Sequence, residues 1–288
     1  MARTMLVTGC SSGFGLAIAR EARERGWDVM GTVRKESDAT ALLEAGCRFT
    51  LLDLCDQDSV EAFGAVVRDW AKGGLSCLVN NAGTTYPGPT MALTRDDLRA
   101  QFEVNTIGHL AVSRELLTPL VSAKGRVMFI SSISGFMPTP MLGAYAASKR
   151  ALEAFAEAFA LETAGLGLSV CVVQPGPYET EIWNTSVPRG ERYLGAEGPF
   201  PDEFITHFTE MGNKVKTVAL GQDMKPASEL GRFVVDKAEA KRVPFYLPSP
   251  GQPRLLRLLH RILPTRWFHR LILKQLNKGH WHGSSPTI

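Results

Sequence analysis

Short apolar segments alternate with segments of helical periodicity over residues 4–175. Apolar residues recur at helical spacing over residues 15–25, 59–72, 95–121 and 144–164. The segments between them are rich in β-branched residues and are typical of buried strands. They read TMLVTG, WDVMGTV, CRFTLLDL, LSCLVNNAG, GRVMFISS and LSVCVVQPG. This alternation predicts an α/β fold, a doubly wound parallel sheet with helices on both of its faces.

The pattern changes after the last of these strands. Residues 178–225 are rich in aromatic residues, Gly and Pro, and predict irregular structure of the kind that is usually functional or mobile. A helix over residues 226–240 and a short strand, VPFYLP, are predicted to follow. Since no repeat and no long linker divides the chain, we expect one domain over residues 1–250 and a C-terminal extension over residues 251–288.

The composition is that of a globular protein. Of the 288 residues 44% are hydrophobic, and the net charge of +3 is too small to indicate a nucleic-acid partner for the whole chain. The five cysteines form no CxxC pair and no metal-ligand spacing with the histidines, so we expect neither disulfides nor a metal site. Reduced cytoplasm fits best. The apolar run at the N-terminus is too short for a signal peptide or a membrane span.

A glycine-rich turn follows the first predicted strand. In VTGCSSGFG, Gly9, Gly13 and Gly15 stand between that strand and the first helix. The open N-terminus of a helix can hold a pyrophosphate through its backbone N–H groups and its dipole. The spacing is GxxxGxG, so a purely structural turn is the alternative to a nucleotide site.

The end of the second strand bears on which dinucleotide would bind. Val33 stands where an NAD site usually has an acidic residue, and Arg34 and Lys35 follow it. A guanidinium suits a 2′-phosphate, and the hydroxyl of Ser12 could contact the same phosphate. We therefore expect NADP(H), with solvated loop charges as the alternative for Arg34 and Lys35.

The sequence YAASK opens the helix over residues 144–164. Tyr145 and Lys149 are four residues apart and share one helix face. A cation beside a phenol lowers the pKa of that phenol, and such a tyrosine could exchange protons near neutral pH. Two ordinary surface residues are the alternative.

The motifs TGCSSGFG, NNAG, VNTIG, YAASK and PG occur in this order, with Ser132 before the YAASK motif. With them, roughly the first 180 residues resemble the short-chain dehydrogenase/reductase family in its single-domain branch. The resemblance implies a Rossmann-like fold and hydride transfer between a nicotinamide and a ketone or secondary alcohol. It also implies one dinucleotide-binding catalytic domain with a substrate lid at about residues 181–225.

The resemblance assigns catalytic roles to four residues. Tyr145 matches the general acid/base, and Lys149 matches the residue that lowers its pKa and binds the nicotinamide ribose. Ser132, thirteen residues before the tyrosine, matches the residue that orients the substrate oxygen. Ser131 is the competing candidate, but it would face the other side if the strand continues to it. Asn105 matches the residue that holds a water behind the lysine, with a helix-distorting Asn as the alternative.

The resemblance also implies the contacts of the coenzyme. Tyr178 departs from the family pattern, in which a smaller aliphatic residue is commoner at this place. The expected contacts are Gly9, Ser11, Ser12, Gly13, Phe14, Gly15, Arg34, Asp53, Leu54, Asn81, Ala82, Gly83, Tyr145, Lys149, Pro175, Gly176, Tyr178 and Thr180.

The lid is rich in large apolar side chains, which favours a bulky apolar substrate and resembles hydroxysteroid and retinol dehydrogenases in style. The alternative is that these groups only pack the lid down. They are Ile182, Trp183, Tyr193, Leu194, Phe200, Phe204, Phe208 and Met211. Met141 and Leu142 are expected to line the same pocket.

The C-terminal extension is strongly basic. Residues 254–278 carry five Arg, two Lys and no acid, a formal charge of +7 that leaves −4 for the rest of the chain. The periodicity predicts two short amphipathic helices broken at Pro264. Peripheral contact with a membrane surface, closure of the substrate pocket and a dimer contact are the alternatives for these helices. A nucleic-acid partner is less favoured. His260, His269, His280 and His282 are expected to be solvated.

Two other functions remain open from the sequence. One is an NAD-dependent alcohol dehydrogenase of small substrates, and the other is a non-catalytic protein that senses or binds a dinucleotide. The complete set of four catalytic candidates argues against the second. The resemblance implies a homodimer or homotetramer.

Overall fold

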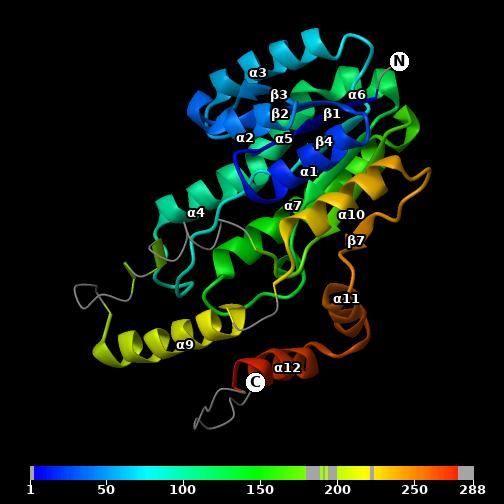
Figure 1. Cartoon of the computed structure of the whole chain (residues 1–288). Coiled ribbons are helices and arrows are strands. Elements are labelled where there is room, and N and C mark those ends of the chain that lie inside the picture. Colours follow the sequence, from blue (N-terminus) through cyan, green and yellow to red (C-terminus); the bar gives the residue numbers. More distant parts are fainter. Residues whose placement is uncertain (1–2, 180–188, 191, 194–199, 221–223, 278–288) are drawn as a thin grey trace.

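The computed structural model describes residues 3–179, 189–190, 192–193, 200–220 and 224–277. Its centre is a parallel sheet of seven strands in the order β3-β2-β1-β4-β5-β6-β7 (Figure 1). The order reverses between β1 and β4, where the crevice of a doubly wound sheet opens at the carboxyl ends of the strands. The strands are β1 Thr4–Val7, β2 Asp28–Val33, β3 Arg48–Leu51, β4 Cys77–Asn80, β5 Arg126–Ile130, β6 Ser169–Gln174 and β7 Tyr246–Pro248.

Helices cover both faces of the sheet, which confirms the predicted architecture. One face carries α1 (Gly13–Glu24), α2 (Thr40–Glu44) and α10 (Ala227–Glu239). The other face carries α3 (Gln57–Trp70), α5 (Gly108–Glu115) and α7 (Gly143–Glu162). Successive residues of a strand point to opposite faces, so each strand supplies both cores.

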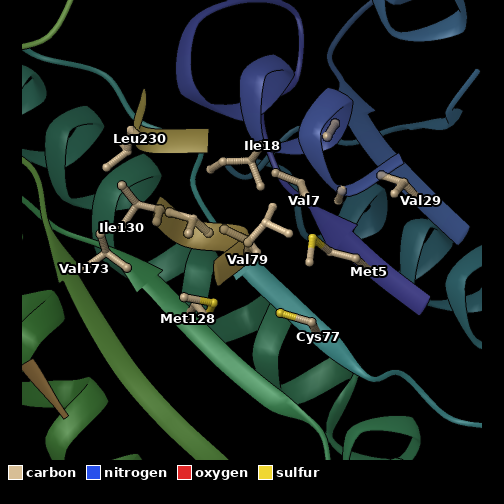
Figure 2. Close-up of a cluster of buried hydrophobic side chains, with 14 of the residues drawn as sticks. Met5, Val7, Ile18, Val29, Cys77, Val79, Met128, Ile130, Val173 and Leu230 are labelled. Atoms are coloured by element: carbon tan, nitrogen blue, oxygen red, sulfur yellow. The ribbon is translucent and has the colours of Figure 1, made fainter. Parts of the chain in front are cut away.

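Strand β1 shows this division directly. Met5 and Val7 lie in one core with Ile18 of α1 and Leu230 of α10, as Figure 2 shows. Leu6, between them, is fully buried in the other core. Met5, Leu6 and Val7 are therefore all apolar, as expected for a strand with helices on both of its faces, and only Thr4 at its start is polar.

The helix predicted over residues 95–121 is in fact interrupted. It divides into α4 (Arg95–Phe102), a π-helical turn at Glu103–Ile107, α5 and α6 (Leu117–Ala123). The break before α6 is followed by Pro119, which has no N–H to donate to a preceding turn. The π-helical turn contains Asn105, so the alternative of a helix-distorting asparagine describes this position correctly.

The prediction of irregular structure over residues 178–225 is wrong for α9 (Asp202–Leu220). Phe204, Phe208, Met211 and Val215 recur at the spacing of one helix face, and Pro201 marks the start of the helix. The Gly- and Pro-containing stretch before the helix dominates the composition of residues 178–225, so the helical spacing was not recognised from the sequence. The short helix α2 was not expected either.

The two helices predicted in the basic extension are present, with Pro264 between them. They are α11 (Gln252–Ile262) and α12 (Thr265–Asn277), and α12 lies against α9 at one end of the sheet (Figure 1). Helix α11 contacts β7 and the 3₁₀ turn Ile133–Gly135. Whether the chain divides at residue 250 stays a prediction. No helix within the described ranges is both long and apolar enough to cross a membrane.

Candidate active site

One cavity of about 800 Å³ opens at the carboxyl ends of the strands. Most of the residues predicted for the site line it: Gly9, Ser11, Ser12, Gly13, Phe14, Arg34, Asp53, Leu54, Asn81, Ala82, Gly83, Ser132, Tyr145, Lys149, Pro175, Gly176 and Tyr178. Gly15 and Asn105 are buried and are not part of this lining. Thr180 lies outside the described residues.

The turn after β1 requires glycine for reasons of space. A Cβ on Gly15 would lie 2.1 Å from the carbonyl oxygen of Gly9. Gly9 has a φ of +71°, and a Cβ there would lie 2.8 Å from Cα of Ala82. The backbone of the turn therefore packs directly on neighbouring backbone and leads into the N-terminus of α1, where N–H groups are open to an anion.

Polar side chains hold this turn in place. Asn81 donates from Nδ2 to the carbonyl oxygens of Thr8, at 2.8 Å, and Gly9, at 3.2 Å. The hydroxyl of Thr8 accepts from the N–H groups of Asn81 and Ala82 at 2.9 and 3.0 Å. Thr32 Oγ1 accepts from the N–H of Gly9 at 3.1 Å. Neither threonine was predicted as a site residue, although Thr8 is the first residue of the motif TGCSSGFG.

The end of β2 gives the cavity a cationic side chain. Strand β2 ends at the buried Val33, and the exposed Arg34 lines the cavity. Asp38 lines the same region and was not predicted, whereas Lys35 is not part of the described lining. A glycine cradle, the hydroxyls of Ser11 and Ser12 and a guanidinium at the end of β2 fit a dinucleotide that carries an additional phosphate.

Tyr145, Ser132 and Lys149 meet on the opposite side of the cavity. Tyr145 and Lys149 are one turn apart on α7, and the Lys149 ammonium lies 5.9 Å from the centroid of the tyrosine ring. Ser132 follows β5 and hydrogen-bonds to Tyr145. The Lys149 ammonium donates to the carbonyl oxygen of Ile130 at 2.7 Å, which ties α7 to the end of β5.

The pKa expected for Tyr145 is wrong in direction. Burial raises the pKa of Tyr145, and only the hydrogen bond with Ser132 opposes that rise. Burial lowers the pKa of Lys149 to about 8, against the opposing effect of the Glu153 carboxylate. For each pKa the effect of desolvation exceeds that of the opposing polar neighbour, Ser132 or Glu153, and the sequence could not indicate this desolvation.

Strand β5 ends at Ile130, so the strand alternation does not decide the orientation of Ser131, which also lines the cavity. Its hydroxyl donates to Glu153 Oε1 at 2.7 Å, and Gln174 Nε2 donates to the same oxygen at 2.8 Å. Burial raises the pKa of Glu153, and these two hydrogen bonds oppose the rise. Glu153 therefore joins β5, β6 and α7 directly behind the site. Its place four residues after Lys149 was a signal that the sequence reasoning did not use.

Asn105 is fully buried behind the cavity. Its Oδ1 accepts from the N–H of Thr84 at 2.8 Å, and its Nδ2 donates to the carbonyl oxygen of Thr84 at 3.0 Å and to Ser148 Oγ at 3.1 Å. These bonds hold the π-helical turn against α7 and the segment after β4. Its role in holding a water stays a prediction.

The substrate side differs in part from the predicted one. Leu142 lines the cavity, but Met141 is not part of the described lining; its carbonyl oxygen accepts from the N–H of Gly88. Among the predicted lid residues, Phe204 stacks on Phe200 at a centroid distance of 4.5 Å and contacts Phe208 in a tilted arrangement at 4.3 Å. None of the described residues from that predicted set lines the cavity, so the alternative that these side chains only pack the lid down fits them better. Ile182, Trp183 and Leu194 lie outside the described residues. Arg189, Val215 and Met224 line the cavity instead.

The basic extension closes the cavity from outside. Its lining side chains are Gln252, Leu256, Leu259, Phe268, Leu271, Ile272 and Leu276. His260 lies between Phe136 and Phe268, at centroid distances of 5.5 and 5.2 Å, so the prediction that it is solvated is wrong. Burial lowers the pKa of His260. Arg257 stacks over Tyr246 at 4.1 Å and fixes α11 on β7. His280 and His282 lie outside the described residues.

Comparison with known proteins identifies the family. Residues 3–190 match the family described as short chain dehydrogenase. The chain is 32% identical over 285 residues to the NADPH-dependent 3-dehydrocapnine reductase of Ornithobacterium rhinotracheale, with 96% of this chain and 98% of that protein covered. It is 33% identical over 276 residues to retinol dehydrogenase 5 of Homo sapiens, with 91% and 85% covered. A short-chain dehydrogenase structure from Streptomyces avermitilis is similar, with a TM-score of 0.76, 27% identity, and 97% and 98% coverage.

The chain therefore belongs to the short-chain dehydrogenase family and is an oxidoreductase of that family. Within the described residues, no three His, Cys, Asp or Glu side chains form a group that could hold a metal ion.

Proposed function

We propose that the protein is an NADP(H)-dependent oxidoreductase that interconverts a bulky, apolar ketone and its secondary alcohol. The observation that carries this proposal is the meeting of Ser132, Tyr145 and Lys149 on one wall of a cavity whose other wall is the glycine turn with Arg34. Both the coenzyme and a carbonyl compound can therefore lie within reach of the same phenol.

Tyr145 acts as the proton donor in the reducing direction. Its raised pKa keeps the phenol protonated near neutral pH, and this is the form that can donate a proton to a developing alkoxide. Ser132 donates a second hydrogen bond to the same oxygen and holds it in place. Lys149, largely charged at pH 7, favours the phenolate that remains after the transfer. NADPH, held by the glycine turn and Arg34, would supply the hydride from its nicotinamide.

Arg34 supports NADP(H) as the coenzyme. It lines the cavity directly after β2, next to a buried Val33 that offers no carboxylate to ribose hydroxyls. The name of the relative from Ornithobacterium rhinotracheale describes that enzyme as NADPH-dependent.

The apolar lining supports a bulky substrate. Leu142, Leu256, Leu259 and Phe268 are among the apolar residues that line the same cavity as Tyr145. Retinol dehydrogenase 5 is similar over most of the chain, and its name gives retinol, a bulky apolar alcohol, as its substrate.

The test measures coenzyme consumption by wild type, Tyr145→Phe and the control Tyr246→Phe. The substrates are steroid ketones, retinal, a long-chain aliphatic ketone and small ketoesters, each with NADPH and with NADH. We expect turnover with NADPH on a bulky ketone, and a loss of about 10²–10⁴-fold in Tyr145→Phe only. Tyr246 is not part of the described cavity lining, so its phenylalanine variant should keep full activity.

Three results would contradict the proposal. Preference for NADH would indicate the NAD-dependent alternative, and turnover of small ketoesters alone would refute the bulky substrate. NADPH binding without turnover of any substrate would favour the non-catalytic dinucleotide-binding alternative.

A further inference from the structure

Helix α11 presents two apolar faces rather than one. Leu256 and Leu259 line the cavity. Leu255, Leu258 and Ile262 are 57%, 54% and 64% exposed. At 3.6 residues per turn, these three side chains lie about a quarter turn around the helix from the cavity-lining pair. The second face is therefore a separate apolar strip that faces solvent beside the cavity.

A cationic strip borders the exposed apolar strip on its other side. Arg254 and Arg261 are exposed and lie about a quarter turn further around α11. None of the ion pairs formed by described residues involves a cation of α11 or α12. Arg254 and Arg261 are thus not neutralised by an ion pair within the described residues, whereas Arg257 and Arg270 stack on aromatic rings.

Helix α12 repeats the same order of faces. Phe268 and Ile272 line the cavity, and Leu271 lines its rim while staying 46% exposed. Trp267, 60% exposed, comes next around the helix, and the exposed Lys274 lies beside it. Both helices thus run from cavity lining through exposed apolar side chains to cations.

The charge of this surface decides which partner fits. Residues 252–277 contain no acidic residue, so pairing the surface with a second copy of itself would bring cations against cations. A nucleic acid would pair the cations but leave the exposed leucines and Trp267 in water. An anionic lipid surface takes up both, since cations meet headgroups while Trp and Leu enter the boundary with the acyl chains.

We propose that α11 and α12 dock the protein on an anionic lipid surface, with the rim of the cavity turned toward the lipid. The surface is defined by Leu255, Leu258, Ile262 and Trp267 with the flanking cations. If the proposed function holds, an apolar substrate passes from the bilayer into the cavity along Leu271. The docking itself does not depend on that activity.

The experiment is co-sedimentation of the full chain with vesicles of phosphatidylcholine alone or mixed with phosphatidylglycerol. The double variant Leu258→Asp with Trp267→Asp places two carboxylates in the apolar strip. Leu161→Asp is the matched control, because Leu161 on α7 is 75% exposed and lies outside the surface. Arg254→Gln with Arg261→Gln removes charge without altering an apolar residue. None of these residues is part of the described cavity lining.

We expect wild type and the control to bind the anionic vesicles, with binding weakened by salt, and not to bind phosphatidylcholine alone. The double aspartate variant should bind at least about ten-fold more weakly, and the double glutamine variant should weaken anionic binding in the same direction. Melting curves check that each variant is folded. Because vesicle binding needs no turnover, its failure is distinguishable from failure of the proposed activity.

Wild type that stays in the supernatant with both kinds of vesicle would overturn the proposal. So would equal loss in the Leu161 variant, or undiminished binding in both double variants. A change of oligomeric mass in sedimentation velocity, without vesicle binding by wild type, would assign the surface to a second copy instead.

Discussion

Replacement of Gly15 by alanine tests the packing of the coenzyme cradle. The new Cβ would lie 2.1 Å from the carbonyl oxygen of Gly9 and 2.7 Å from Asn81 Nδ2. Relief requires a shift of the turn or of the Asn81 side chain, which then loses its hydrogen bonds to Thr8 and Gly9. Overpacking costs about 1–3 kcal/mol, and each lost hydrogen bond about 1 kcal/mol. We expect the free energy of unfolding to fall by about 2–5 kcal/mol.

Thermal melting and NADPH titration measure this effect. For a chain of this length 1 kcal/mol corresponds to about 2 °C in Tm, so Gly15→Ala should melt about 4–10 °C lower and bind NADPH more weakly. Gly165→Ala is the matched control, because its Cβ would meet no atom within 4 Å and its φ is not positive. Wild-type Tm and NADPH affinity in Gly15→Ala would refute the reasoning about the cradle.

Three further predictions concern single side chains. Burial lowers the pKa of His109 to about 3 in the folded protein. Below about pH 6.5 the unfolded chain therefore binds a proton that the folded protein does not, and the free energy of unfolding falls by about 1.4 kcal/mol for each unit that the pH is lowered. Urea titrations from pH 7 to 5 should show a shallower slope in His109→Gln, and an unchanged slope would contradict this. Glu153→Leu removes the acceptor of two buried hydrogen bonds and should cost about 2–4 kcal/mol in urea unfolding, whereas Glu153→Gln should cost clearly less; equal costs would argue against the network. Arg34→Ala should weaken NADPH about 10–100-fold and NADH little, and Lys35→Ala should weaken neither strongly; fluorescence titration distinguishes these cases.

The coenzyme side of the cavity could be predicted because its determinants are local in sequence. Each buried strand of a parallel sheet is a continuous apolar run, and the residues that follow it gather at one edge. The spacing of Gly9 and Gly15 after β1, and the position of Arg34 after β2, therefore translate directly into places in the fold. Tyr145 and Lys149 are equally local, since one helical turn separates them.

The remaining features depend on contacts between distant segments. Thr8 and Thr32 brace the turn only because β1, β2 and β4 are neighbours in the sheet. The raised pKa of Tyr145 reflects desolvation by the surrounding protein, which a pair of residues four apart does not indicate. Helix α9 was missed because a Gly- and Pro-containing stretch precedes it. The tail was predicted as two helices, but its place over the cavity required the contacts of His260 and Arg257.

The two sides of the cavity are held in place by different interactions. One side carries the proton-transfer groups, and the other side controls how a substrate enters. Backbone packing and hydrogen bonds from the sheet fix the glycine turn, Ser132 and Lys149. The outer wall comes largely from α11 and α12, and stacking of aromatic and basic side chains such as Arg257 on Tyr246 attaches it. Exposed elements with few buried contacts open at lower free energy than a core sheet. We therefore expect the outer wall to open more readily than the proton-transfer groups move, so substitutions in the tail should change substrate entry before they change the chemical step.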